Sequence, residues 1–261
     1  MNFDTLKDKC EYFRSLSDHR LVPNSYVVIM LDGRSFSKLI KNKYAKPFDS
    51  TFIGMMNETA KYLVQNIQGA KFAYVQSDEI SILVTDFDTP VTDALFGYRL
   101  CKIQSICAAM AASKFNQLTL INDNKNSDSG IQVLLENQKL VEFDCKAWSV
   151  PDYNTAFCHF LWRQNDCTRN SKQQAAQTYL SHKELMGLDT DKQVALLNEK
   201  KGIDWNNYND GEKYGRIIFK VIKKMERDGV EYERSVWEEH SATPFSEEDN
   251  VIKTLIPKRN E

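Results

Sequence analysis

Two short acidic motifs carry the residue types most able to do chemistry in this sequence. In the first, residues 31–36, Asp32 ends an apolar stretch and is followed by Gly33, which lets the backbone carbonyl approach a ligand closely. In the second, residues 76–79, the adjacent carboxylates of Asp78 and Glu79 repel each other unless a cation or a base neutralises them. Taken singly, the first is also typical of an Asp-Gly turn and the second of a solvated acidic turn.

The segments around these motifs predict a sheet that positions both. Residues 26–31 are apolar on both faces, as in a central strand, and residues 71–76 and 80–85 predict a tight hairpin with the carboxylates at its tip. A helix is expected over 50–68, capped by Asp49 or Ser50, and another from Thr92 or Asp93 to 116. Further expected elements are a helix at 4–16, a loop around 41–47, a polar loop at 122–130, a turn at 137–138 and a strand at 140–143.

This order is β-α-β-β-α-β, the split βαβ arrangement, so we expect an α+β fold with an antiparallel sheet and two helices on one face. After Pro151 the composition shifts, with helices expected at 152–180 and 191–200 and a closing hairpin of 214–222 with 230–236. We expect a catalytic core over residues 1–150 and a helical and hairpin extension over 151–261, packed on that core.

In a split βαβ sheet the first strand and the central hairpin are neighbours, so Asp32 and Asp78 are expected to project from the same end. Two carboxylates with the Gly33 carbonyl nearby are hard oxygen ligands that suit Mg²⁺. Two such ions, ~3.5–4 Å apart, can clamp the attacking and leaving oxygens of a phosphoryl displacement. The two motifs together therefore predict a two-metal site for phosphoryl transfer.

Basic side chains follow the acidic motifs and could neutralise a triphosphate. Arg34 follows the first carboxylate, Asp32, and Lys46 lies in a loop stiffened by proline. Arg99 and Lys102 are three residues apart and share a helix face, for which a solvated charged surface is the alternative. On the helix expected at 152–180, a polar face could bind phosphates or build internal ion pairs; it comprises Arg163, Asp166, Arg169 and Asn170.

Composition limits the remaining function classes. The chain has 261 residues and a formal net charge of −2, which argues against a strongly basic nucleic-acid binder but is compatible with a local basic patch. Its 6 cysteines form no C-x-x-C pair, and its 4 histidines are scattered. There is no apolar run of ~20 residues and no signal-like start, so we expect no membrane contact and a cytoplasmic, reducing location.

Together the motifs resemble the tRNA-His guanylyltransferase family, and more closely its Thg1-like branch of 3′-to-5′ RNA polymerases. The likeness covers roughly residues 26–188. It is carried by Asp32-Gly33-Arg34 with Phe36, Lys46-Pro47-Phe48-Asp49, Ser77-Asp78-Glu79, Phe143-Asp144, and Trp162-Arg163-Gln164 through Arg169-Asn170-Ser171.

The resemblance implies a palm-like sheet in which two Mg²⁺ ions are held by Asp32, the Gly33 carbonyl and Asp78, with Glu79 supporting catalysis. It also implies ATP or GTP as activating substrate, tRNA as partner and a homotetramer. Nucleotide or triphosphate contacts would come from Arg34, Ser35, Phe36, Lys46, Ser77, Arg99 and Lys102, and RNA contacts from Arg163, Arg169 and Asn170.

The implied activity is template-dependent 3′-to-5′ addition of nucleotides to the 5′ end of tRNA, as in 5′-end repair. Guanylyltransferases proper carry a His-Ile-Asn-Asn segment where this chain has Thr168-Arg169-Asn170-Ser171, which favours the Thg1-like branch. The alternatives are a tRNA-His guanylyltransferase proper, a nucleotidyl cyclase and a non-catalytic RNA-binding protein. Gln76-Ser77 in place of paired glycines argues against the cyclase, and the retained carboxylates argue against the non-catalytic protein.

Overall fold

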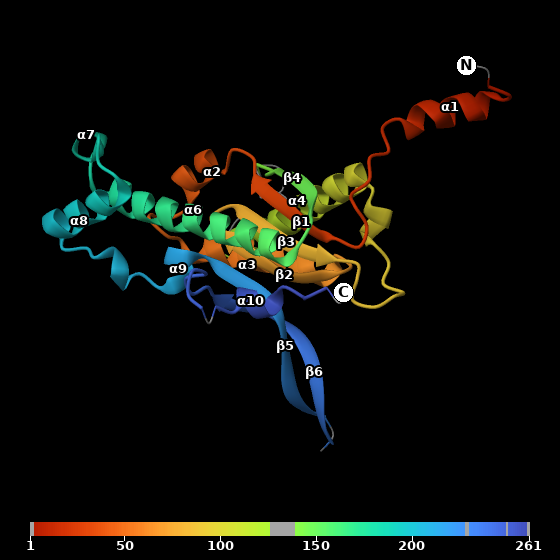
Figure 1. Cartoon of the computed structure of the whole chain (residues 1–261). Helices are drawn as coiled ribbons and strands as arrows, with labels where there is room; N and C mark the ends of the chain where they lie inside the picture. Colours follow the sequence, from red (N-terminus) through yellow and green to blue (C-terminus); the bar gives the residue numbers. More distant parts are fainter. Residues whose placement is uncertain (1–2, 126–138, 228–229, 249, 260–261) are drawn as a thin grey trace.

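A computed structural model describes residues 3–125, 139–227, 230–248 and 250–259. Figure 1 shows a sheet flanked by helices, with α1 standing apart from the body and the β5–β6 hairpin projecting from it. In chain order the elements are α1 (Leu6–Ser15), β1 (Tyr26–Gly33), α2 (Phe36–Lys43), α3 (Ser50–Asn66), β2 (Ala70–Gln76), β3 (Glu79–Thr85), η1 (Leu95–Tyr98), α4 (Leu100–Lys125), β4 (Phe143–Val150), α6 (Tyr153–Tyr179), α7 (His182–Leu185), α8 (Thr190–Lys201), η2 (Trp205–Asn207), α9 (Asp210–Tyr214), β5 (Arg216–Arg227), β6 (Val230–Ser241) and α10 (Ile252–Leu255).

The six strands form one antiparallel sheet in the order β4-β1-β3-β2-β5-β6. β1 lies between β4 and β3, and its first five residues are buried or nearly so because they are apolar on both faces. The predicted α+β class with the β2–β3 hairpin beside β1 is confirmed. β5 pairs with β2, so the sheet continues across residue 150, and the two-part division placed there stays a prediction.

Both faces of the sheet are covered. On one face Ile29 and Leu31 pack with α3 and α4, as predicted for two helices on one face. On the other face Val28 packs with Phe160 of α6 and with the segment around Phe245. Burying each such side chain stabilises the fold by about 1.5–3 kcal/mol, so the sheet is a rigid support for the residues at its edge.

Several helix boundaries follow from local capping. Asp49 caps α3 by accepting from the Phe52 backbone N–H at 2.9 Å, and Asp152 caps α6 by accepting from the Thr155 N–H at 2.7 Å. The predicted start of the next helix at Thr92 or Asp93 is wrong. Phe96, Gly97 and Tyr98 have positive φ angles in η1, and because this left-handed backbone cannot continue a right-handed helix, α4 begins at Leu100.

Three other predicted boundaries differ. The strand expected at 140–143 is wrong, because the residues that pair with β1 are those of β4, Phe143–Val150. The loop expected around 41–47 overlaps α2, and the polar loop expected at 122–130 begins inside α4. Residues 126–130 and the predicted turn at 137–138 lie outside the described residues.

The hairpin of β5 and β6 is longer than predicted. β5 pairs with β2 only over Arg216–Phe219, so its second half extends beyond the sheet (Figure 1). Side chains there, such as those of Ile222 and Val230, are exposed. Within the described residues, no helix combines the length and apolar character needed to cross a bilayer.

Candidate active site

The two acidic motifs meet at one end of the sheet. Asp32 lies near the end of β1, opposite Glu79 of β3 on one side and Asp144 of β4 on the other. The Gly33 N–H donates to the backbone oxygen of Asp78 at 3.1 Å. Ser77 takes a positive φ of 44° in the two-residue turn between β2 and β3, the conformation that such tight hairpins need. The predicted convergence of Asp32 and Asp78 is therefore present.

The carboxylates at this end crowd one another. Burial, followed by the negative charge of Asp32, raises the pKa of Asp78 to about 6. Burial also raises the pKa of Asp32, with Asp144 and Glu79 adding to the effect. Both shifts mean that the site disfavours two bare negative charges, so a bound cation would stabilise the ionised pair.

The donor set fits Mg²⁺. Two carboxylates and a glycine carbonyl offer hard oxygens, and magnesium sites are usually completed by water and substrate phosphates. No group of three or more His, Cys, Asp or Glu side chains forms a metal centre within residues 3–125, 139–227, 230–248 and 250–259. An open site with few protein ligands suits a metal that binds together with a triphosphate, and the crowded pair of Asp32 and Asp78 supplies its charge complement.

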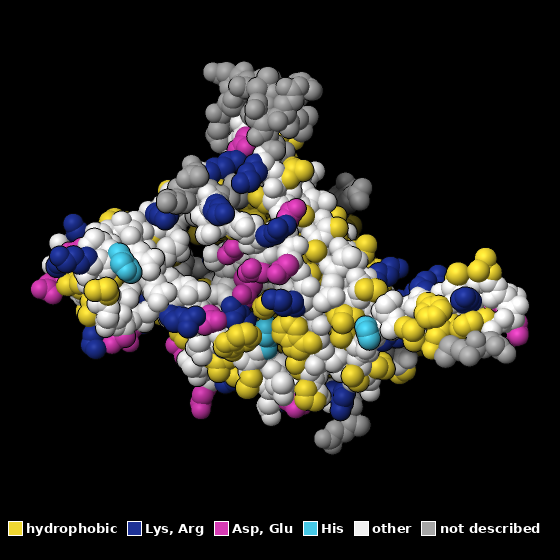
Figure 2. Space-filling view, turned by 90° about the horizontal axis from the view of Figure 1, so that it is seen from above, with side chains coloured by type: hydrophobic (Ala, Val, Ile, Leu, Met, Phe, Trp, Pro, Cys, Tyr) yellow, Lys and Arg dark blue, Asp and Glu magenta, His cyan; other side chains and the backbone are white. Residues whose placement is uncertain are grey.

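A pocket of about 280 Å³ extends from these carboxylates. Asp32 lines the pocket near the end of β1, and Ser77 and Asp78 line it from the turn between β2 and β3. Figure 2 shows acidic side chains gathered near the centre of this face, with basic side chains beside them. The remaining walls combine apolar and amide-bearing side chains of the type found in ligand pockets. They include Pro47, Phe48, Asp49 and Phe52 before and within α3, and Asn170, Ser171 and Gln174 of α6.

Arg216 also lines this pocket, and sequence reasoning missed it. The side chain is only 5% exposed, with Nε donating to Asn57 Oδ1 at 3.1 Å and Nη1 to the Gly211 carbonyl at 3.0 Å. Its Nη2 has no hydrogen-bond partner among the described residues, and burial lowers its pKa. No local signal marks an arginine at a strand start as buried, because its burial depends on how β5 packs against α3.

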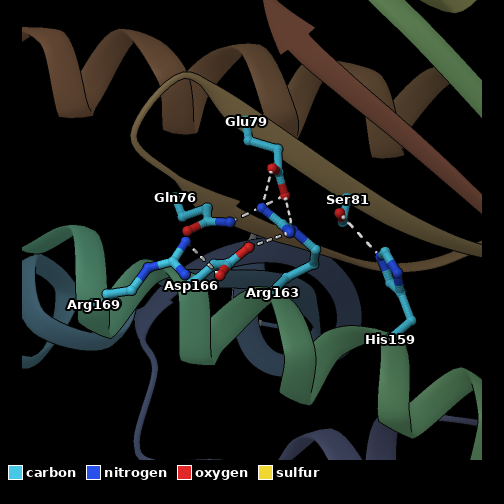
Figure 3. Close-up of polar contacts among 7 residues, drawn as sticks. All are labelled: Gln76, Glu79, Ser81, His159, Arg163, Asp166 and Arg169. Carbon is cyan, nitrogen blue, oxygen red and sulfur yellow. Dashed lines mark hydrogen bonds and ion pairs between the residues drawn. The ribbon is translucent and has the colours of Figure 1, made fainter.

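Arg163 is the second arginine of the pocket and is engaged internally (Figure 3). Nε and Nη2 donate to the two carboxylate oxygens of Glu79 at 2.8 and 2.7 Å, and Nη1 donates to Asp166 at 2.7 Å. The Arg163 and Glu79 side chains are each 10% exposed. Of the two alternatives left open by the sequence, internal ion pairing is the one that this residue adopts, so its predicted RNA contact is corrected.

The side chains of Arg169 and Asn170 have different surroundings from that of Arg163. The Arg169 guanidinium contacts Asp166 at 2.9 Å but remains 57% exposed, and Asn170 lines the pocket. Both can still reach a ligand, so their RNA-binding role stays a prediction.

The residues after Asp32 are only partly at the pocket. Arg34 is exposed and pairs with Glu142 at 2.6 Å, and Ser35 is exposed with a positive φ of 60°.

Phe36 is 1% exposed and packs against Phe115 and Phe143, with ring centroids 5.2 Å apart in each case. Phe36 is thus a core residue, and its predicted nucleotide contact is corrected because its ring has no free face. Lys46 is exposed in the loop beside the pocket, and Ser77 lines it.

Arg99 and Lys102 lie elsewhere on the same chain. They line a second concave surface with residues of α1, and Arg99 pairs with Asp18 at 3.4 Å. On α4, 13 residues separate Lys102 from Phe115, which packs beside the start of β4; at 1.5 Å per residue that is ~20 Å. The chain therefore does not bring Arg99 and Lys102 to the pocket that holds Asp32 and Asp78, which corrects their predicted place in one common site.

Asp144 and Lys146 are neighbours of the site that were not predicted as site residues. Asp144 raises the pKa of Asp32, whereas Lys146 lowers it. Because the expected strand ended at Phe143, no register could be predicted that places Asp144 opposite Asp32.

The chain is similar to known proteins in both sequence and structure. A family described as tRNAHis guanylyltransferase matches residues 7–151. A bacterial tRNA(His) guanylyltransferase (Thg1)-like protein, solved in complex with ATP, is 31% identical with a TM-score of 0.81, covering 97% of this chain and 99% of the other. A structure of a bacterial Thg1-like protein in complex with GTP is 30% identical with a TM-score of 0.76 over the same shares.

A sequence relative supports the same assignment. The tRNA(His) guanylyltransferase of Debaryomyces hansenii is 25% identical over 224 residues, which cover 81% of this chain and 80% of that protein. The family match spans more than half of the chain and includes both acidic motifs. The chain therefore belongs to the tRNAHis guanylyltransferase family and is a nucleotidyltransferase.

Proposed function

We propose that the protein adds nucleotides in the 3′-to-5′ direction to the 5′ end of tRNA, directed by the opposite strand, as in 5′-end repair. The observation that carries the proposal is the meeting of Asp32, Ser77 and Asp78 at one end of a pocket. Solved relatives with ATP or GTP bound support a nucleoside triphosphate as the ligand. We further propose that the enzyme acts as a cytoplasmic homotetramer.

The reaction takes place in two transfers. In the first, an oxygen of the tRNA 5′-monophosphate attacks the α-phosphorus of ATP or GTP, and pyrophosphate leaves. In the second, the 3′-hydroxyl of an incoming nucleoside triphosphate attacks the 5′-phosphorus of the activated RNA, and the nucleoside monophosphate leaves. Both transfers displace an anionic group at phosphorus, so one electrostatically equipped site can serve both.

The chain's own residues bind and orient the reactants. Asp32, the Gly33 carbonyl and Asp78 would hold two Mg²⁺ ions, which when bound offset charge on the phosphates and activate oxygen nucleophiles. Ser77 and Lys46 donate hydrogen bonds to the triphosphate in the activation step, and Arg34 and Ser35 supply further donors beside the first carboxylate. Arg169 and Asn170 contact the RNA.

The deciding experiment uses a 5′-monophosphorylated tRNA that lacks its first nucleotide, incubated with Mg²⁺, ATP to activate the 5′ end, and each of the four triphosphates in turn. Extension only by the nucleotide that pairs with the opposite strand supports the proposal. Four substrates with different opposing nucleotides serve as matched templates, and an Asp78→Asn variant serves as the inactive control.

The second candidate is a tRNA-His guanylyltransferase proper, favoured by the name of the Debaryomyces relative. It predicts addition of G to tRNA-His whatever nucleotide lies opposite. Such a result would replace the repair proposal, and no transfer of label from α-³²P ATP or GTP to any tRNA would contradict both.

A further inference from the structure

The two adjacent carboxylates at the tip of the β2–β3 hairpin have different surroundings. Glu79 is bound through both oxygens by Arg163, and Oε1 also accepts from Gln76 Nε2 at 3.2 Å. Asp78 makes no ion pair with any described residue and faces the pocket beside Asp32. One carboxylate is therefore held and the other is left free for a ligand.

Arg163 is itself fixed on several sides (Figure 3). Nη1 donates to Asp166 one turn further along α6, at 2.7 Å. The guanidinium lies over the Trp162 ring, 4.3 Å from its centroid. A bidentate contact from a guanidinium held in this way fixes both the position and the plane of the Glu79 carboxylate.

The hairpin gains a defined turn from this contact. Ser77 and Asp78 are the only residues between Gln76 and Glu79; Gln76 donates to Glu79, and Glu79 in turn accepts from Arg163 of α6. The turn is thus closed at its base by side-chain contacts as well as by the sheet. A shift of ~1 Å in a catalytic group can lower a rate 10²-fold, so the closure of this turn matters for transfer.

We propose that Arg163 is a positioning residue, which holds Glu79 against α6 and thereby fixes the Ser77-Asp78 turn beside Asp32. Glu79 acts through its ion pair with Arg163 and does not touch the reacting atoms. The inference rests on the proposed function for its effect on transfer, but the contact itself is tested without any substrate.

The kinetic test compares Glu79→Gln, Arg163→Gln and the double variant in transfer of label from α-³²P GTP or ATP to a 5′-monophosphorylated tRNA. Each single variant leaves one buried charge without its partner, whereas the double variant leaves two amides that can bond to each other. We expect each single variant to lower kcat by about 30-fold or more with the triphosphate KM changed by less than about threefold, and the double variant to recover kcat above both.

The contact is tested in the metal-free chain by hydrogen–deuterium exchange. A peptide that covers residues 74–82 should exchange at least about tenfold faster in Arg163→Gln than in the unaltered protein, because the turn opens more often. Lys200→Gln is the matched control: it breaks a 2.7 Å ion pair with Glu184 between α7 and α8, away from the pocket, and should change neither exchange at 74–82 nor kcat.

The outcomes separate the two proposals. A double variant as slow as Glu79→Gln would show that the carboxylate itself serves the reaction and would overturn the inference. Unchanged exchange at 74–82 in Arg163→Gln would overturn it as well. If the unaltered protein transfers no nucleotide, the proposed function fails, while faster exchange in Arg163→Gln would still establish that Arg163 holds the turn.

Discussion

Two arginine–carboxylate contacts in this molecule differ in geometry and in burial. Arg163 and Glu79 meet at 2.7 Å beside the pocket, each with 10% of the side chain exposed. Arg99 and Asp18 meet at 3.4 Å near α1, with 49% and 31% exposed. The buried pair fixes a hairpin that carries a carboxylate of the site, whereas the half-exposed pair lies where water competes for both partners. Burial, rather than residue type, decides which pair can define a geometry.

The two ion pairs differ in strength because the effective dielectric constant around them differs. Two unit charges 4 Å apart interact by about 1 kcal/mol in water and by about 4 kcal/mol at an effective dielectric of 20. Desolvation offsets this gain in the interior, so a buried pair matters chiefly because losing one partner strands the other.

The largest effect is expected at the carboxylates. Asp78→Asn or Asp32→Asn should lower nucleotidyl transfer by about 10³-fold or more, because the charge that complements the metal and phosphates is removed. The unfolding midpoint should stay or rise, since burial, with the neighbouring carboxylates adding, raises both pKa values in the folded state. Labelled transfer and thermal unfolding measure the two effects. The control is Asp191→Asn, which alters an 80% exposed carboxylate of α8. Near-normal turnover of Asp78→Asn would refute the proposed role of Asp78.

The buried pair should dominate the stability comparison. Arg163→Met should lower the free energy of unfolding by about 3–5 kcal/mol, because Glu79 is then buried without its cation. Urea unfolding followed by circular dichroism measures this loss. A change below about 1 kcal/mol would mean that the pair resembles a surface contact.

Acid should destabilise the buried region through His159. Burial, with the nearby Arg163 charge adding, lowers the pKa of His159 to about 4, below the ordinary value of about 6.5 in the unfolded chain. Between these values the unfolded chain binds the proton more readily, so His159 by itself lowers the free energy of unfolding by about 3 kcal/mol as pH drops from 6.5 to 4, while the raised pKa of Asp78 acts in the opposite direction over the same range. Unfolding measured across this range in the unaltered protein and in His159→Gln, which can keep a bond to Ser81, isolates the His159 contribution. The difference in stability between the two proteins should change progressively as the pH falls, and equal slopes would assign the effect to other groups.

The smallest effect is expected at the half-exposed pair. Asp18→Asn should change the free energy of unfolding by less than about 1 kcal/mol, because water and salt screen both partners. Repeating the measurement in 1 M NaCl, where the Debye length is about 3 Å, should reduce the difference further. A loss as large as that of Arg163→Met would remove the contrast between the two regions.

Features with a local cause were predictable. The apolar run at 26–31 predicted a central strand, and the β-α-β-β-α-β order of the elements predicted that Asp32 and Asp78 meet. Asp49 and Asp152 cap helices through their own backbone neighbours, which sequence reveals directly. The α4 start was missed because three residues in left-handed conformation override a good capping sequence.

The sequence by itself determined the order of strands and helices and the meeting of two acidic motifs, because hydrophobic periodicity and turn chemistry act over a few neighbouring residues. Only the tertiary structure decided that Arg163 faces Glu79 rather than RNA, that Phe36 lies in the core, and that Arg99 lies far from the pocket. Each of these depends on which elements pack together, and a side chain's own neighbours in the chain do not reveal what it will touch.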